Sequence, residues 1–82
     1  MTDILYFGRL SDITRKQFEN VDLPVDVTHA CDLRSWAEAR FQAEGVFLEP
    51  TVRIAVNGEI VDEAHPLANA NEIAFMPPVG GG

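Results

Sequence analysis

The pair Asn57-Gly58 constrains the fold more than any other part of the sequence. It follows residues 52–56, in which apolar residues occupy every second position, and it precedes Glu59-Ile60-Val61. Alternation of this kind is typical of a strand that buries one face. Asn-Gly is the strongest short signal for a tight hairpin, because both turn residues must adopt positive φ. The sequence therefore predicts an antiparallel hairpin over residues 52–61.

Three further segments have the composition of strands. The run Ile4–Phe7, closed by Gly8, and the run Ile73–Met76, stopped by Pro77-Pro78, are short and rich in β-branched and aromatic residues. Residues 16–23 form a less regular strand pattern that includes Phe18 and ends before Pro24, and residues 10–13 can form a single helical turn before it. Together with the hairpin, these segments predict about five strands.

One segment has a helical pattern. Between residues 32 and 44, Leu33, Trp36, Ala37 and Phe41 recur at three- and four-residue steps along one face. Gly45 stands where a residue that ends a helix in the left-handed conformation is expected. The pattern predicts one main helix over residues 32–44, with Trp36 in the core.

The order of these elements predicts an α+β fold in a single domain. Two hairpins around one helix, with the first and last strands side by side, form the β-grasp arrangement, a mixed sheet of about five strands. The same order also allows a ferredoxin-like arrangement with different crossovers. We expect a β-grasp domain over residues 1–76 and a flexible, glycine-rich C-terminal tail over residues 77–82.

The first and last predicted strands are apolar on both faces, whereas one helix can cover only one face of a sheet. Leu5 and Phe7 point away from Ile4 and Tyr6, and the last strand repeats this pattern. Either residues 46–50 fold over the second face and complete an ordinary core, or that face is a docking surface for a partner protein. The pattern favours neither interpretation.

Composition excludes several classes of function. A chain of 82 residues is too small to enclose a deep pocket of its own, so chemistry must occur at its surface or in a partner. A net charge of -7 with six Lys and Arg argues against nucleic acid and suits a basic protein partner. One cysteine, Cys31, allows neither an internal disulfide nor a cysteine-rich zinc site, and no metal site is expected. No stretch is long enough to span a membrane and no signal peptide is evident, so we expect a cytoplasmic protein.

The C-terminal residues are the most specific feature of the sequence. After Glu72 no charged side chain follows, and the chain closes with Pro77, Pro78, Val79 and the glycines Gly80, Gly81 and Gly82. Two prolines enforce a stiff, extended exit from the last strand, and three glycines produce an end without side chains that can enter a narrow channel. Six nearly extended residues span about 20 Å. The tail can therefore deliver its terminus into the active site of a neighbouring protein.

Several segments together carry a resemblance to a known family. They are Ile4–Phe7, Asp32-Leu33-Arg34, Val56-Asn57-Gly58, His65-Pro66-Leu67 and above all residues 72–82, EIAFMPPVGGG. The sequence resembles the small, sulfur-carrying subunit of molybdopterin synthase, a family of ubiquitin-like proteins. Two positions depart from the family pattern: His29 stands where a threonine often caps the helix, and Asn69-Ala70-Asn71 replaces a glycine-containing acidic turn.

The resemblance implies a carrier that is not an enzyme on its own. An activating adenylyltransferase, related to those that start ubiquitin transfer, would use ATP to adenylate the carboxylate of Gly82. A sulfur donor would then convert the adenylate to a thiocarboxylate. In the large catalytic subunit, this sulfur would build the dithiolene of molybdopterin on a cyclic pterin phosphate precursor. The chain itself would bind no cofactor, because ATP and the sulfur donor are used by the activating enzyme.

The resemblance also implies how the partners assemble. Phe7, Ile60 and Met76 would contact the large subunit through the second face of the sheet, in a heterotetramer of two small and two large subunits. Three alternatives remain open from the sequence: a carrier that supplies sulfur for thiamine or for transfer RNA, a ubiquitin-like protein modifier, and a binding module without terminal chemistry. We expect Cys31 to be a packing residue and Asp62-Glu63 to lie in a solvated loop.

Overall fold

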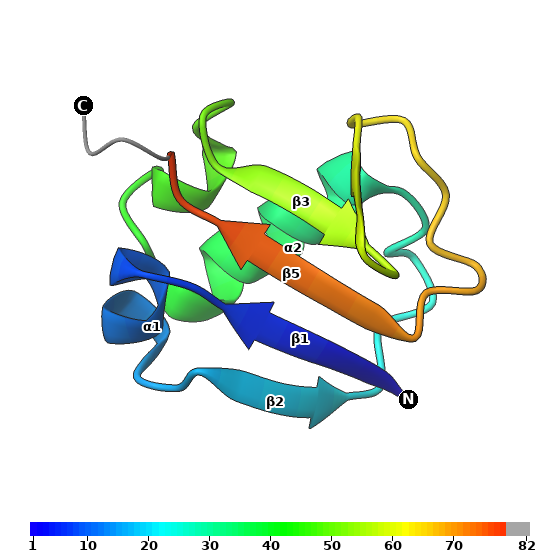
Figure 1. The fold of residues 1–82 in the computed structure, drawn as a ribbon, viewed down its shortest axis with the longest axis horizontal. Coiled ribbons are helices and arrows are strands. Elements are labelled where there is room, and N and C mark those ends of the chain that lie inside the picture. The colour runs from blue at the N-terminus through cyan, green and yellow to red at the C-terminus, as the bar shows by residue number, and fades with distance from the viewer. Residues whose placement is uncertain (79–82) are drawn as a thin grey trace.

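The computed structural model describes residues 1–78, which form a five-stranded sheet with one long helix across one face (Figure 1). The strand order is β2-β1-β5-β3-β4, and β1 and β5 run parallel at the centre while the other pairs are antiparallel. This topology confirms the β-grasp prediction and excludes the ferredoxin-like alternative. The elements are β1 (Thr2–Tyr6), α1 (Arg9–Thr14), β2 (Phe18–Val21), α2 (Ala30–Phe41), the 3-10 helix η1 (Val46–Leu48), β3 (Arg53–Val56), β4 (Glu59–Val61) and β5 (Glu72–Met76).

The predicted hairpin is present as β3 and β4, and its turn does more than reverse the chain. Asn57 and Gly58 have φ values of 51° and 88°, as the Asn-Gly pair predicts. The Asn57 side chain donates to the carbonyl of Asn69 at 3.1 Å and accepts from the backbone N–H groups of Asn71 and Glu72 at 2.9 and 3.1 Å. Asn57 therefore connects the β3–β4 turn to the segment that leads into β5.

The main helix begins two residues earlier than predicted, at Ala30, with His29 as its N-cap residue. The Asp32 carboxylate accepts the backbone N–H groups of Thr28 and His29 at 3.1 and 3.0 Å, and also the Thr28 hydroxyl at 3.0 Å. These bonds, the one from the Thr28 backbone first, hold the pKa of Asp32 below its usual value. The helix start is therefore fixed by Asp32, without a threonine at the cap position.

The predicted helix end at Gly45 is wrong. Helix α2 ends at Phe41, and Gln42 adopts the left-handed conformation with φ 48°. The Glu38 carboxylate accepts the backbone N–H groups of Gly45 and Phe47 at 2.9 and 3.1 Å. Gly45, with φ 89°, is instead the N-cap residue of the 3-10 helix η1. A side chain on the last full turn of the helix thus directs the chain into a second short helix.

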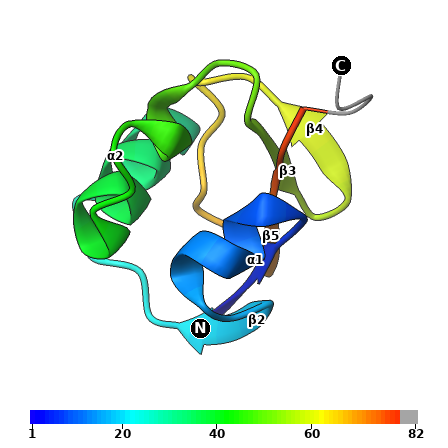
Figure 2. The ribbon, with the colours of Figure 1, turned by 90° about the vertical axis from the view of Figure 1, so that its left-hand side faces the viewer.

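The core lies between the sheet and α2 (Figure 2). Tyr6, Phe47 and Phe75 form its aromatic centre, with ring centroids 5.8 Å apart for Tyr6–Phe75 and 4.9 Å apart for Phe47–Phe75. Trp36 packs only at the margin of this core and is partly exposed, so its prediction as a core residue is correct only in part.

Candidate docking face and tail exit

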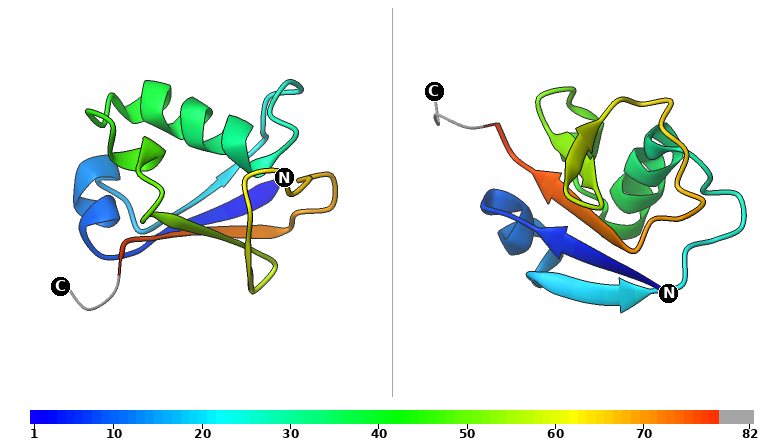
Figure 3. Two further views of the ribbon diagram at one scale, coloured as in Figure 1. Left: turned by 90° about the horizontal axis from the view of Figure 1, so that it is seen from above. Right: turned by 45° about the vertical axis from the view of Figure 1, so that its right-hand side comes forward.

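One face of the sheet is covered by helices and the other is open. Figure 3 (left) shows α2 and the short helical segments on one side of the sheet, and among residues 1–78 no helix lies on the other side. Phe47 is fully buried against Tyr6 and Phe75, whose side chains point toward α2. The interpretation that residues 46–50 cover the second face is therefore wrong, because this segment packs on the helix side.

The open face carries one continuous row of apolar side chains across all five strands. The register pairs Phe18 with Leu5, Leu5 with Ala74, Ala74 with Ala55, and Ala55 with Ile60. Directly paired residues in neighbouring strands point to the same face, so these five side chains lie side by side. We call these five residues the apolar row. Its two ends are the most accessible, because Phe18 is 54% and Ile60 is 62% exposed.

Two more apolar residues lie next to this row, on the side where the chain leaves β5. Phe7, which follows β1, is 47% exposed, and its backbone N–H donates to the carbonyl of Phe75 at 3.2 Å. Met76 pairs with Arg53 across the sheet. A groove of about 460 Å³ lies here, lined by Thr51, Arg53, Ile60, Met76, Pro77 and Pro78. The structure thus gathers Ile60 and Met76 in one groove and places Phe7 at the same end of the face.

The opposite end of the open face is polar. Asp3 pairs with Asn20 on β2 and with Glu72 on β5, and the Asn20 amide donates to the Asp3 carboxylate at 2.7 Å. The apolar surface is therefore confined to the half of the face beside the tail exit, the point at which Pro77 follows β5.

The predicted reactive terminus lies outside the described residues. Pro77 and Pro78 follow β5 without regular secondary structure, whereas Val79, Gly80, Gly81 and Gly82 are not among residues 1–78. The boundary between a domain over residues 1–76 and a tail over residues 77–82 also stays a prediction.

A partly buried ionic network supports the strands on the helix side. The Tyr6 hydroxyl donates to the Glu19 carboxylate at 2.5 Å, and both oxygens of Glu19 accept from Arg40 at 2.7 and 2.8 Å. Burial first, then the hydrogen bond to Glu19 and the charge of Glu19, raise the pKa of Tyr6. Burial also pushes the pKa of Glu19 upward, but the bonds from Arg40 and Tyr6 outweigh it and leave that pKa below its usual value. This network ties β2 and β1 to α2.

Sequence reasoning missed two residues of the open face. The strand pattern of residues 16–23 includes Phe18 but gives it no face, and the alternation over residues 52–56 gives Arg53 no functional role. Neither could be placed without the register, because pairing with Leu5 puts Phe18 on the open face and pairing with Met76 puts Arg53 beside the tail exit.

Other candidate residues have no role at this face. Cys31 is exposed, which overturns its prediction as a packing residue. Glu63 lies in an exposed segment, but its carboxylate accepts two bonds from the Arg34 Nε at 2.8 and 2.9 Å. Within residues 1–78, no group of three His, Cys, Asp or Glu side chains is placed to bind a metal. In the same residues, no helix has the length and apolar character needed to cross a membrane.

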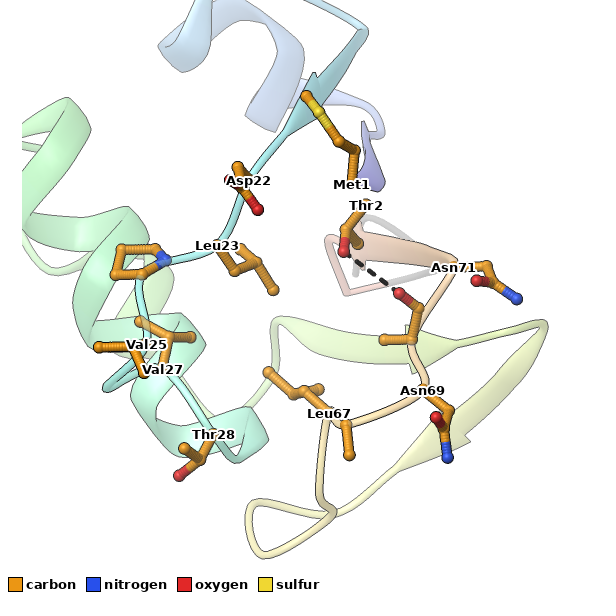
Figure 4. Close-up of a pocket in the computed structure, with 13 residues that line it drawn as sticks. Met1, Thr2, Asp22, Leu23, Val25, Val27, Thr28, Leu67, Asn69 and Asn71 are labelled. Carbon is orange, nitrogen blue, oxygen red and sulfur yellow. Dashed lines mark hydrogen bonds between the residues drawn. The ribbon is translucent and has the colours of Figure 1, made fainter.

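A larger depression, of about 580 Å³, lies at the far end of the molecule (Figure 4). It is bounded by the start of β1, the loop before α2 and residues 67–71, where the Thr2 hydroxyl donates to the carbonyl of Ala70 at 3.2 Å. The starts of the parallel strands β1 and β5 lie there, whereas the tail exit lies beyond their ends. This depression is therefore separate from the groove beside the tail exit.

Comparisons with known proteins agree with this geometry. The model of the ThiS family matches residues 4–82. The crystal structure of SAMP1 from Haloferax volcanii matches with a TM-score of 0.76 at 22% identity, and covers 99% of this chain and 98% of its own. A putative molybdopterin converting factor, subunit 1, from Pyrococcus furiosus matches with a TM-score of 0.74 at 26% identity, covering 95% and 97%. No curated protein matches the chain.

Proposed function

Because the chain belongs to the ThiS family of ubiquitin-like sulfur carriers, we propose that it is the sulfur-carrying subunit of a molybdopterin synthase. Carriers of this family are not catalytic on their own, so the chemistry requires partner proteins. The observation that carries the proposal is the apolar row, which extends across the open face beside Pro77. A partner bound there would hold the tail at the entrance of its own active site. The similarity to a putative molybdopterin converting factor subunit from Pyrococcus furiosus supports the choice of pathway.

The proposed reaction takes place at the carboxylate of Gly82. An activating adenylyltransferase joins this carboxylate to the AMP part of ATP and releases pyrophosphate. Sulfur from a donor at the oxidation level of sulfide then displaces AMP and leaves a thiocarboxylate. In the large subunit, the thiocarboxylate sulfur is the nucleophile that replaces an oxygen substituent on the cyclic pterin phosphate precursor. Water then cleaves the bond between this sulfur and the acyl carbon of Gly82, so the sulfur stays on the pterin and the carboxylate of Gly82 is regenerated.

The composition of the chain suits this division of labour. Residues 73–82 carry no charged side chain, so the tail brings no acidic group beside an anionic phosphate substrate. Phe7, Ile60 and Met76 are the residues that we propose for contact with the large subunit, since all three border the tail exit on the open face. The acidic body, with its net charge of -7, is expected to attract basic surfaces on its partners.

The first test is the chemistry of the terminus. The purified chain is incubated with ATP, the activating enzyme and a sulfur source, and its accurate intact mass and C-terminal fragments are measured. Sulfur should appear on Gly82, and a variant without Gly82 should acquire none. Accurate mass is needed because oxidation of Met76 or Cys31 adds nearly the same mass as the exchange of oxygen for sulfur. A terminus that stays a carboxylate, under conditions that charge a known carrier, contradicts the proposal.

The second test separates the molybdenum pathway from the alternatives. The protein that carries the thiocarboxylate is mixed with the large subunit and the cyclic pterin phosphate precursor, and the dithiolene product is measured. Product with stoichiometric loss of the thiocarboxylate supports the proposal. If the thiocarboxylate form yields no product here but supplies sulfur for thiamine or transfer RNA, the sulfur acceptor is a different one. Covalent adducts on lysines of other proteins in cell extracts would indicate a protein modifier.

A further inference from the structure

Gly8, which lies between β1 and α1, stands beside Pro77, the first residue of the predicted tail, with no room for a side chain between them. Its backbone, with φ 56° and ψ -135°, lies in a region that residues other than glycine rarely adopt. A Cβ atom built on Gly8 would lie 2.9 Å from the Cγ atom of Pro77 and 3.7 Å from its Cδ atom. Carbon atoms in contact stay about 3.5–4.0 Å apart. Position 8 therefore excludes a side chain both by its conformation and by the presence of the Pro77 ring.

Neither partner of this contact can easily move away. The carbonyl of Gly8 accepts the Ser11 hydroxyl at 2.8 Å and the Ser11 backbone N–H at 3.1 Å. The N–H of Phe7 donates to the carbonyl of Phe75, two residues before Pro77. The Pro77 ring contains its own backbone nitrogen and Cα atom, so it cannot rotate away as an ordinary side chain would. The contact thus joins two restrained pieces of backbone.

The other glycines with positive φ do not share this environment. Gly45 and Gly58, with φ 89° and 88°, have no atom within 4 Å of a built Cβ. Their glycines are explained by backbone conformation alone. Gly8 combines a positive φ with close packing against another segment, and that segment leads to the predicted reactive end.

We propose that Gly8 and Pro77 form a contact that fixes the direction in which the chain leaves β5. Gly8 is then a positioning residue: it touches neither the substrate nor the reacting carboxylate, and it sets the direction of the tail relative to the docking face. This inference rests on the proposed function, since direction matters only when the tail must enter the active site of a bound partner. Docking depends on the apolar row, whereas delivery of the terminus depends on the Gly8–Pro77 contact.

The test combines kinetics with a direct measurement of the contact. Four variants are compared with the full-length protein: Gly8→Ala, Pro77→Ala, the double variant and Gly45→Ala. Gly45→Ala is the matched control because it introduces the same methyl group at positive φ, on the helix side, without a neighbour. The constants kcat and KM are measured for adenylation of the C-terminal carboxylate by the activating enzyme. Nuclear Overhauser effects between the Gly8 α-protons and the Pro77 ring protons report the contact independently of any sulfur chemistry.

We expect Gly8→Ala to lower kcat by about tenfold to a hundredfold with KM nearly unchanged, because a misplacement of about 1 Å can cost about 10²-fold in rate. Gly45→Ala should change neither constant by more than about twofold. Adding Gly8→Ala to Pro77→Ala should cause no further loss, since the ring that the methyl group meets is gone.

Three results would overturn the inference: equal effects of Gly8→Ala and Gly45→Ala, a loss confined to KM, or an undiminished loss in the Pro77→Ala background. If Gly8→Ala does not fold, the inference is tested with Pro77→Ala, which must lower kcat more than Pro78→Ala does. Pro78→Ala is the control because it removes a proline at a position that does not face Gly8. If the wild-type chain is not charged at all, the proposed function fails. The Overhauser effects then decide the contact alone, and their absence in the wild-type protein refutes it.

Discussion

Replacing Ile60 with lysine should weaken docking on the open face and leave the fold intact. Ile60 is 62% exposed at the end of the apolar row, so folding already buries only the smaller part of its side chain. Complete burial of an isoleucine is worth about 1.5–3 kcal/mol, and docking over the exposed part would therefore contribute about 1–2 kcal/mol. The lysine loses this contribution and also brings a charge into an apolar contact. We expect a total cost of about 2–4 kcal/mol, which corresponds to a dissociation constant about 30-fold to 1,000-fold higher.

The assay is titration calorimetry of the chain against the large subunit, with urea unfolding as the measure of stability. Val25→Lys is the matched control, because Val25 is 96% exposed in the loop before α2 and the substitution adds the same charge away from the open face. Both variants should unfold with free energies within about 0.5 kcal/mol of the wild-type value, as is usual for exposed positions. If Ile60→Lys and Val25→Lys bind the large subunit equally well, the open face is not the docking surface.

Three further substitutions test the parts of the fold that hold this face. Phe47→Ala should lower the free energy of unfolding in urea by about 3–5 kcal/mol, because the ring is fully buried. Glu19→Gln should lose less stability than the wild type as the pH falls from about 5 to 3. The folded-state pKa of Glu19 lies below its ordinary value of 4.5, so the charged carboxylate stabilises the fold above pH 4.5 and this stabilisation is lost on acidification. The free energy of unfolding in urea is measured at each pH. Asn57→Ala should cost about 1–3 kcal/mol in the same assay, since it removes three hydrogen bonds between the β3–β4 turn and the segment before β5.

Local signals in the sequence predicted the helices and strands well. Errors arose where contacts with residues distant in the sequence decide where an element ends or which face a side chain occupies. The hairpin at Asn57-Gly58 follows from two residues that both require positive φ, so it needs no tertiary information. The end of α2 depends on the Glu38 carboxylate, which binds the N–H groups of Gly45 and Phe47, and no helix-ending rule based on glycine contains that contact. The face of Phe18 depends on its pairing with β1, which becomes known only once the register is fixed.

The state of the second face could not be decided from the strands themselves, because it depends on the size of the residues that α2 presents. On its buried side the helix offers Ala30, Leu33, Arg34 and Ala37, and only Leu33 is a large apolar residue. Phe47 enters this core from η1, and its ring centroid lies 6.1 Å from that of Phe41 and 4.9 Å from that of Phe75. Close packing therefore requires the segment after α2 on the helix side. Among residues 1–78 no helix covers the opposite face, and the ends of the apolar row, Phe18 and Ile60, are left exposed there.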